Sequence, residues 1–437
     1  MTNRSHGVRI YNLFPLLAGP IESWTPHLDR IAAMAFNWVY VNPLHLPGAS
    51  GSLYSVKDYY RFHPLVQGDS KKSADELLAE FTAAAADRGI KVMMDLVLNH
   101  TGIDSVPTES HPEWFVRNHD GSLVSPSAID PADARKRTVW SDLAEIDYSD
   151  RPERAAVVGY FANLVDHAVR LGVRGFRCDA AYKVPAVVWQ PIIAAGREAA
   201  DGTVFLAETL GARLEEVDGL RDAGFDLIYN SAKWWDFREG WLLEQYDRFR
   251  SIAPSVAFPE THDTARLIAD LRDTGIGAKK AVELRYRRAW MFSSVFSAGV
   301  MMPVGFEFGF KRRLHVVETR PEHWEKPAFD LTQFIGEVNR MKADVPALNE
   351  ESPQRAVHLG DGGRVLVLLR RRDGAGDWVV TVVNIDGDAP ATVHRLEYLE
   401  GDIREGREVT PGRAGGPFHV DHAVDLAPAE VRVFAGG

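Results

Sequence analysis

The amino-acid sequence predicts an α/β protein built on a (β/α)₈ TIM barrel, with a small insertion after strand 3 and a C-terminal antiparallel β-sandwich. Three observations predict it. Eight short β-type runs alternate with helical stretches, polar side chains recur where several of these runs end, and hairpin patterns take over beyond residue 351. A doubly wound open sheet shows the same local alternation. The barrel is favoured because its functional residues collect at the carboxyl ends of several strands.

Eight strands are expected in the first part of the chain. They are Val8–Phe14, Trp38–Asn42, Lys91–Leu98, Val173–Asp179, Val204–Thr209, Phe225–Asn230, Val256–Pro259 and Val300–Gly305. The helices between them carry their own signals. Ser73 and Glu76 form a capping box ahead of an apolar helical face. Pro152 opens another helix, in which Val157 and Phe161 share one face.

The chain divides by composition into three parts. Residues 1–100 and 150–350 are expected to form the barrel. Residues 101–149 show little periodicity, and so long a loop is uncommon unless it is functional, so we expect an insertion domain that roofs one side of the site. Residues 351–437 contain β-type runs joined by a turn at 372–377 and are expected to form the C-terminal sandwich.

Bulk properties narrow the function. A net charge of −11 disfavours nucleic acid or an anionic membrane surface as the main partner. The single cysteine, Cys178, excludes an internal disulfide and a cysteine-based zinc cluster. No run approaches a membrane span and no apolar leader precedes the first strand, which predicts a cytoplasmic protein. The oligomeric state cannot be read from the sequence.

The fourth expected strand ends in Arg177 and Asp179. Side chains two apart on a strand share a face, so both should point into the barrel mouth, where the cation would keep Asp179 ionised for nucleophilic attack. A buried structural ion pair is the alternative. On the third strand, Asp95 and the following His100 are polar groups at an apolar strand end, which need partners. His100 could bond a substrate hydroxyl or only position the insertion.

Two further carboxylates belong to the same rim. Glu208 follows three apolar residues at the end of the fifth strand, and apolar surroundings raise the pKa of a carboxyl group, as a general acid requires. Asp263 follows His262 after the seventh strand. Taken singly, Asp263 could be a turn residue. A nucleophile and an acid/base about 5–5.5 Å apart are what glycosyl transfer with retention needs.

Four segments resemble the signature regions of the α-amylase superfamily, in the same order. They are Asp-Leu-Val-Leu-Asn-His (95–100), Gly-Phe-Arg-Cys-Asp (175–179), Ala-Glu (207–208) and His-Asp (262–263). The resemblance extends through the barrel and the C-terminal sandwich. It implies that Asp179 is the nucleophile, Glu208 the acid/base and Asp263 the transition-state stabiliser.

The same resemblance implies the surrounding roles. Arg177 would orient Asp179 and bond Asp95, while His100 and His262 would hold sugar hydroxyls. Tyr54 matches the tyrosine that stacks under the sugar, and packing in the core is its alternative role. The remaining expected substrate-binding residues are Tyr182, Lys183 and Trp234. For Trp234, packing under a helix is the alternative to lining an outer sugar subsite.

Two differences from the family's motifs affect the expected metal binding and the expected sugar donor. Tyr182 and Lys183 stand where many members of the superfamily have Lys-His, whose histidine often helps to hold a structural calcium. We expect no cofactor, and this difference disfavours a structural calcium ion, although Asn99 keeps one potential calcium ligand and the acidic insertion could supply others. Segments 233–237 and 316–324 are similar to bacterial maltosyltransferases that use maltose 1-phosphate, but those enzymes typically carry asparagine where this chain has Ala180.

The expected function is a retaining hydrolase of α-glucosidic bonds in α-glucans or oligosaccharides, with transglycosylation as a side activity. The alternative enzyme is a glycosyltransferase that uses a sugar phosphate or an oligosaccharide donor. A catalytically inactive barrel that serves as a binding subunit is a third hypothesis, and the complete set of carboxylates argues against it. Linkage and chain-length preference are not predicted. The basic trio 311–313 could meet an anionic group or be a solvated loop.

Overall fold

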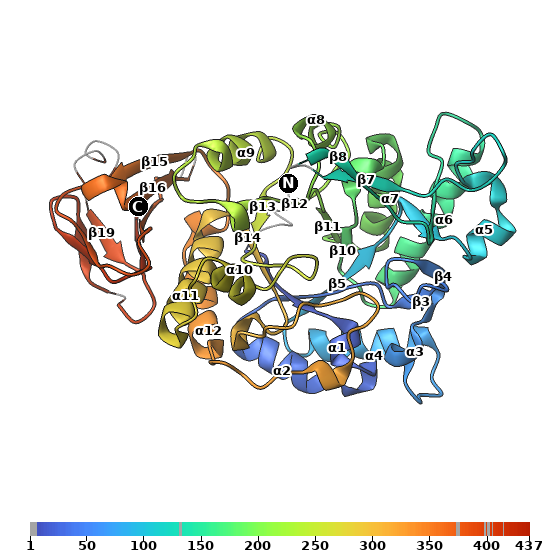
Figure 1. Ribbon diagram of the computed structural model, residues 1–437, viewed down its shortest axis with the longest axis horizontal. Helices are drawn as coiled ribbons and strands as arrows, with labels where there is room; N and C mark the ends of the chain where they lie inside the picture. The colour runs from blue at the N-terminus through green and yellow to red at the C-terminus, as the bar shows by residue number, and fades with distance from the viewer. Residues whose placement is uncertain are drawn as a thin grey trace.

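A closed barrel of eight parallel strands forms the centre of the protein, as a computed structural model shows (Figure 1). The structure describes residues 7–130, 133–372, 376–396, 399, 403, 405–413 and 415–437. The barrel strands, in their order around it, are β1 (Arg9–Leu13), β2 (Trp38–Val41), β5 (Lys91–Leu96), β10 (Gly175–Cys178), β11 (Val204–Ala207), β12 (Leu227–Tyr229), β13 (Ser255–Ala257) and β14 (Gly299–Pro303). All eight overlap expected strands, and the predicted barrel is confirmed.

Helices surround the barrel. They are α2 (Thr25–Ala33), α4 (Ala74–Ala86), α6 (Glu153–Arg170), α7 (Ala186–Ala199), α8 (Leu214–Asp218), α9 (Trp241–Phe249), α10 (Leu267–Asp273), α11 (Lys279–Phe296) and α12 (Thr332–Asp344). Ser73 caps α4 through the predicted reciprocal box with Glu76. Short helices α1 (Pro15–Ala18) and α3 (Pro64–Gln67) and the strands β3 (His45–Pro47) and β4 (Val56–Phe62) complete the first part. No helix in the described part of the chain is long and apolar enough to cross a membrane.

Two apolar layers hold the barrel. Inside it, side chains from most of the strands pack together, among them Tyr40, Leu206, Tyr229 and Met301. Outside it, the opposite faces of the strands pack on the helices, where Phe161 of α6 and Trp189 of α7 are buried. Burial of apolar area on both faces of each strand favours a parallel sheet covered by helices. The side chains at the carboxyl ends of the barrel strands are available to form a functional site.

The segment after β5 is an insertion made of short antiparallel pairs. β6 (His100–Gly102) pairs with β9 (Leu143–Glu145), and β7 (Ser127–Asp130) pairs with β8 (Asp133–Val139). α5 (Val106–Ser110) precedes them. Figure 1 shows the insertion beside the mouth of the barrel, at the end of the molecule opposite to the C-terminal sheet. Residues 131 and 132 lie outside the described residues.

The C-terminal part contains a six-stranded antiparallel sheet, as predicted. Its order is β15 (Gln354–Leu359), β16 (Val365–Arg371), β17 (Trp378–Asn384), β22 (Val431–Gly436), β19 (Glu405–Glu408) and β20 (Pro417–His419). A second sheet of β18 (Ala391–Val393) and β21 (Val424–Leu426) shares its buried cluster, in which Val380 and Phe434 meet Val393 and Leu426. Residues 373–375 of the expected turn lie outside the described residues.

Candidate active site

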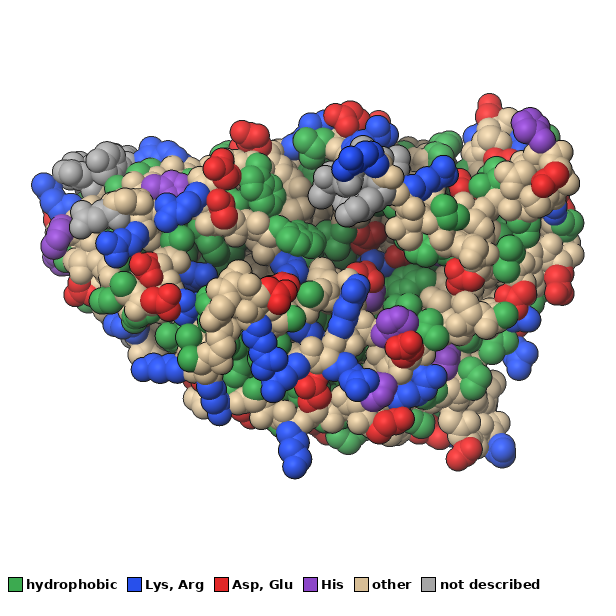
Figure 2. All heavy atoms as spheres, viewed as in Figure 1, with side chains coloured by type: hydrophobic (Ala, Val, Ile, Leu, Met, Phe, Trp, Pro, Cys, Tyr) green, Lys and Arg blue, Asp and Glu red, His purple; other side chains and the backbone are tan. Residues whose placement is uncertain are grey.

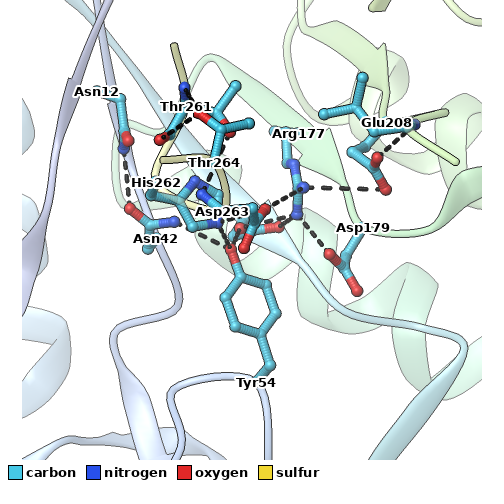
Figure 3. Close-up of polar contacts among 12 residues, drawn as sticks. Asn12, Asn42, Tyr54, Arg177, Asp179, Glu208, Thr261, His262, Asp263 and Thr264 are labelled. Atoms are coloured by element: carbon cyan, nitrogen blue, oxygen red, sulfur yellow. Dashed lines mark hydrogen bonds and ion pairs between the residues drawn. The ribbon is translucent and has the colours of Figure 1, made fainter. Parts of the chain in front are cut away.

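Arg177 is the centre of the candidate site. It lies on β10 and is 2% exposed, so its charge must be matched by neighbouring carboxylates. Its Nη1 donates to Oδ1 of Asp179 at 2.5 Å and to Oδ1 of Asp95 at 3.0 Å. Its Nη2 lies 3.9 Å from Oε2 of Glu208 and 3.9 Å from Oδ2 of Asp263 (Figure 3). One guanidinium therefore gathers carboxylates from four different strand ends.

The register of the barrel explains this convergence. Arg177 pairs with Asp95 on β5 and with Leu206 on β11, so parallel neighbours bring their carboxyl ends to one rim. Asp179 and Glu208 each lie one residue beyond their strands, β10 and β11. Asp179 is 15% exposed and Glu208 is 9% exposed at the side chain, whereas Asp95 is fully covered. Asp95 therefore supports Arg177 from behind, and the other two face the cavity.

The environment of Glu208 fits an acid. Burial raises its pKa, Arg177 opposes that shift, and the Asp179 and Asp263 carboxylates raise the pKa further, to about 7. Its carboxyl group is held by two backbone N–H donors, from Ala180 at 2.9 Å and from Leu210 at 2.6 Å. Glu208 is thus fixed in place, and its proton can be given or taken near neutral pH.

The pKa of Asp263 is shifted downward, in the opposite direction to that of Glu208. Burial raises the pKa of this carboxyl group, but His262, Arg177 and Arg313 lower it to about 2. Its side chain is 52% exposed to the cavity, and its Oδ2 lies 3.0 Å from Nε2 of His262. With a pKa of about 2, the Asp263 carboxyl group is ionised near neutral pH. An ionised carboxylate at this position is suited to stabilise the positive charge that develops in an oxocarbenium-like transition state.

Tyr54 links two sides of the site. Its hydroxyl donates to Oδ2 of Asp95 at 2.7 Å and lies 2.7 Å from Nε2 of His262 (Figure 3). The Tyr54 ring lies parallel to the His262 ring, with 5.8 Å between the two centroids. The guanidinium of Arg177 lies 5.9 Å from the centroid of the Tyr54 ring. The ring is thus held rigidly where it lines the cavity.

A cavity of about 430 Å³ opens above these groups. Its lining includes Asp179, Glu208 and Asp263 on the barrel side and Trp140 and Asp142 on the insertion side. Figure 2 shows the hollow in this face of the molecule, with acidic side chains inside it. The volume is that of a small-ligand pocket. The insertion therefore covers one side of the carboxylates.

The other expected site residues divide into three groups. His100, Tyr182 and Lys183 line the cavity, and Nε2 of His100 is a buried ring nitrogen without a hydrogen-bond partner among the described residues. His262 is buried behind Tyr54 and Asp263. Trp234 is not brought into the cavity: it is 51% exposed, with its ring edge-on to Phe258.

Sequence reasoning missed Trp140, which lines the cavity from the turn between β8 and β9 and is 40% exposed. The turn is fixed, because Trp140 N–H donates to Pro126 and its carbonyl accepts from Leu143 N–H. The available signal was an aromatic residue in an aperiodic insertion, but Trp114 and Phe115 give the same signal there and are buried in the core instead. Which wall of the barrel Trp140 reaches depends on how the insertion folds back.

Lys183 ties the insertion to the barrel. Its Nζ donates to the carbonyl oxygen of Ser127 on β7 at 3.1 Å. Two acidic side chains of the insertion have other partners: Asp104 pairs with Lys57 at 3.1 Å and Asp147 with Arg151 at 3.3 Å. Among the residues that the structure describes, no group of three or more His, Cys, Asp or Glu could hold a metal. An ammonium group here disfavours a calcium ion nearby.

Comparisons with known proteins support the predicted resemblance to α-amylase-family enzymes. Residues 4–120 match the family model for the glucanotransferase domain of glycogen debranching enzyme. The α-amylase of Lactobacillus plantarum superposes with a TM-score of 0.74 at 20% identity, with complete coverage of both chains. AmyP in complex with maltose gives a TM-score of 0.72 at 16% identity, covering 99% of this chain and 97% of the other. Homologues and structural neighbours are α-amylase-family enzymes, so the predicted resemblance is confirmed.

The chain is also similar to maltosyltransferases. It is 26% identical over 409 residues to the alpha-1,4-glucan:maltose-1-phosphate maltosyltransferase of Burkholderia pseudomallei, covering 92% of this chain and 35% of that protein. With the enzyme of the same name from Myxococcus xanthus it shares 27% identity over 414 residues, 86% of this chain and 58% of that one. The chain thus spans between about a third and three fifths of these relatives' lengths.

Proposed function

We propose that this chain acts on α-glucosidic bonds of α-glucans or oligosaccharides by double displacement, with retention of the anomeric configuration. One observation carries the proposal: the Arg177 guanidinium contacts Asp179 and lies 3.9 Å from both Glu208 and Asp263. A nucleophile, an acid/base and a stabilising anion thereby face one cavity, which is the set of groups that a retaining glycosidase needs.

The first step requires Asp179 to be ionised and Glu208 to be protonated. Asp179 attacks the anomeric carbon of the bound sugar while Glu208 protonates the departing glycosidic oxygen, which breaks the glycosidic bond and forms a glycosyl ester on Asp179. A pKa of about 7 leaves much of Glu208 protonated near neutral pH, as this step requires. Asp263, with its low pKa, remains an anion beside the ring.

The second step reverses these roles. Glu208, now a carboxylate, takes a proton from a water molecule, which attacks the anomeric carbon and releases Asp179. A sugar hydroxyl in place of water gives transglycosylation. We propose hydrolysis as the main outcome and transfer to sugar acceptors as a side reaction. His100, whose Nε2 has no partner among the described residues, would bond a hydroxyl of the sugar.

A maltosyltransferase-like enzyme with a sugar-phosphate donor is the second candidate. The observation that favours it is the similarity to maltose-1-phosphate maltosyltransferases over 92% of this chain. The Lys183 ammonium, which lines the cavity, could meet a phosphate there. Both candidates use the same carboxylates, so the acceptor and the leaving group separate them.

One experiment decides between these candidates. Maltooligosaccharides, isomaltose, trehalose, sucrose and maltose 1-phosphate are incubated with the protein, and products are followed by anomeric NMR and phosphate release. Hydrolysis predicts free α-configured sugars from an α-linked oligosaccharide without phosphate. Release of phosphate without free maltose would favour transfer, and a β-configured first product would contradict retention.

We also propose that the enzyme needs no cofactor and no calcium ion between insertion and barrel. The bond from Lys183 to Ser127 supplies a cationic bridge at that junction. The proposed partners are α-linked sugars only.

A further inference from the structure

The loop that carries His262 and Asp263 is closed by a buried ion pair. This catalytic loop, residues 260–266, lies between β13 and α10 and ends directly before α10. Glu260 at its start is 0% exposed and Arg266 at its end is 2% exposed. Nη1 of Arg266 donates to Oε1 of Glu260 at 2.8 Å, and the backbone N–H of Leu267 donates to Oε2 at 2.6 Å. The two ends of the catalytic loop are thus joined through one carboxylate.

The interior of the catalytic loop is braced as well. The N–H of Thr261 donates to Oγ1 of Thr264 at 2.9 Å, and the N–H of Asp263 donates to Oγ1 of Thr261 at 3.2 Å. These bonds fix the backbone on both sides of His262 (Figure 3). The backbone at Asp263 is therefore tied to the rest of the catalytic loop.

A second loop is attached to the first by its arginines. Nε of Arg266 donates to the carbonyl oxygen of Arg312 at 3.0 Å. In return, the Arg313 side chain donates to the carbonyl oxygen of Asp263. The N–H groups of Lys311 and Arg312 are in turn held by Glu325, at 2.9 and 2.7 Å. The basic trio 311–313 thus contacts the catalytic loop through its main chain and Arg313.

We propose that Glu260 and Arg266 are positioning residues that set Asp263 against Arg177 and the reacting sugar. The inference rests on the proposed function of Asp263 as the stabilising anion. A buried ion pair is costly to desolvate, and well-packed apolar residues often replace one without loss of stability. A geometric purpose explains the pair here, because it joins the first and last residues of the catalytic loop and also bonds the backbone N–H of Leu267 and the carbonyl oxygen of Arg312.

A double-mutant cycle tests this positioning role. Glu260→Gln keeps the shape of the side chain and removes its charge. We expect kcat on a maltooligosaccharide to fall roughly 10- to 100-fold with little change in KM, since a small misplacement of a group that acts in the transition state has this effect. In an Asp263→Asn background, the same substitution should change kcat/KM less than about threefold, because its target is already lost.

Two controls keep the test decisive. Glu283→Gln removes a carboxylate from a partly exposed Glu–Arg pair near the start of α11 and should leave kcat unchanged. Arg266→Lys should recover part of the activity that Arg266→Met loses, because it keeps the charge. Equal losses from Glu260→Gln in the wild-type and Asp263→Asn backgrounds would overturn the positioning role.

A readout that does not need activity separates this inference from the proposed function. Amide hydrogen exchange in Glu260→Gln should speed up across 261–264, in the middle of the catalytic loop, as well as at Leu267. Faster exchange at 266–268 alone would contradict the inference. If the wild-type protein turned over no α-glucoside, the proposed function would fail, while this exchange pattern would still decide whether the ion pair holds the catalytic loop.

Discussion

The backbone N–H of Ala180 donates a 2.9 Å hydrogen bond to Oε2 of Glu208. Ala180 directly follows Asp179 and adopts the left-handed conformation, with φ of +42°. That conformation costs a residue with a side chain about 1 kcal/mol. The turn lets the residue after the proposed nucleophile hold the proposed acid/base, which couples the positions of the two carboxyl groups.

Ala180→Asn tests whether this position selects the donor. Asparagine tolerates the left-handed conformation, so we expect the variant to fold with an unchanged or slightly higher Tm. An added amide at a donor phosphate contributes about 1.5 kcal/mol, so phosphate release from maltose 1-phosphate should rise roughly tenfold relative to hydrolysis. Ala180→Gly is the control, since it relieves the same strain without an amide. Equal changes in both variants would argue against donor selection.

Asp179→Asn should abolish turnover and leave the fold intact. Loss of a nucleophile lowers kcat by about four orders of magnitude or more, and the side chain keeps nearly the same volume. Reducing-sugar release and a thermal melt measure the two effects. A fluorosugar inactivator should add its mass to the wild-type protein at Asp179. Asp142→Asn, on the roof of the same cavity, should change kcat less than about tenfold. Substantial turnover by Asp179→Asn would show that Asp179 is not the nucleophile.

The raised pKa of Glu208 predicts an alkaline limit. Because the acid form is needed to protonate the leaving group, kcat/KM for an oligosaccharide should fall as the pH rises through about 7. Asp263, with a pKa of about 2, should add no acidic limit above pH 3. An α-glucosyl fluoride needs no protonation of its leaving group, so its pH profile should lack this alkaline fall. Identical profiles for the two substrates would contradict the assignment.

Trp140→Ala should weaken binding of oligosaccharides. The ring lines the cavity from the insertion, and an aromatic face over a sugar contributes about 1 kcal/mol, so KM should rise roughly fivefold with kcat nearly unchanged. Trp234→Ala is the matched control, because this tryptophan is at least as exposed but lies outside the cavity lining. A larger effect at Trp234 than at Trp140 would establish an outer subsite beside Phe258.

Lys183→Met should loosen the insertion. Without the bond to Ser127, amide exchange in 124–130 and 138–145 should speed up, and calcium should not restore it. The wild-type Tm should be the same with EDTA and with calcium chloride. Lys57→Met, which breaks the ion pair with Asp104 at another point of the insertion, is the control and should leave those segments unchanged. A wild-type Tm that rises by several degrees with calcium would refute the absence of a calcium bridge.

Much of the barrel could be predicted because its signals are local. Each strand is a short apolar run, and Glu76 lies three residues after Ser73, so their reciprocal cap depends on neighbours in the chain. Arg177 and Asp179 could be placed on one face for the same reason, since alternation along a strand needs no knowledge of the rest of the fold.

The insertion and the loops after the strands could not be predicted in this way. Trp140 reaches the cavity only because β8 and β9 fold back over the barrel, and Trp234 stays outside because its turn packs beside Phe258. Glu260 and Arg266 are six residues apart and carry no periodic signal, so nothing in the sequence shows that they meet. Such contacts depend on the path of irregular backbone, which local propensity does not specify.

The sequence by itself determined the order of the strands, the helices between them and the types of residue at each strand end, because these follow from hydrophobic period and chain neighbours. Only the tertiary structure decided that Asp179, Glu208 and Asp263 surround one guanidinium, that burial and mutual repulsion raise the pKa of Glu208 while nearby cations lower that of Asp263, and which aromatic residue faces the cavity. Charge interactions act through space over a few ångströms, so they depend on distances that only the closed barrel sets.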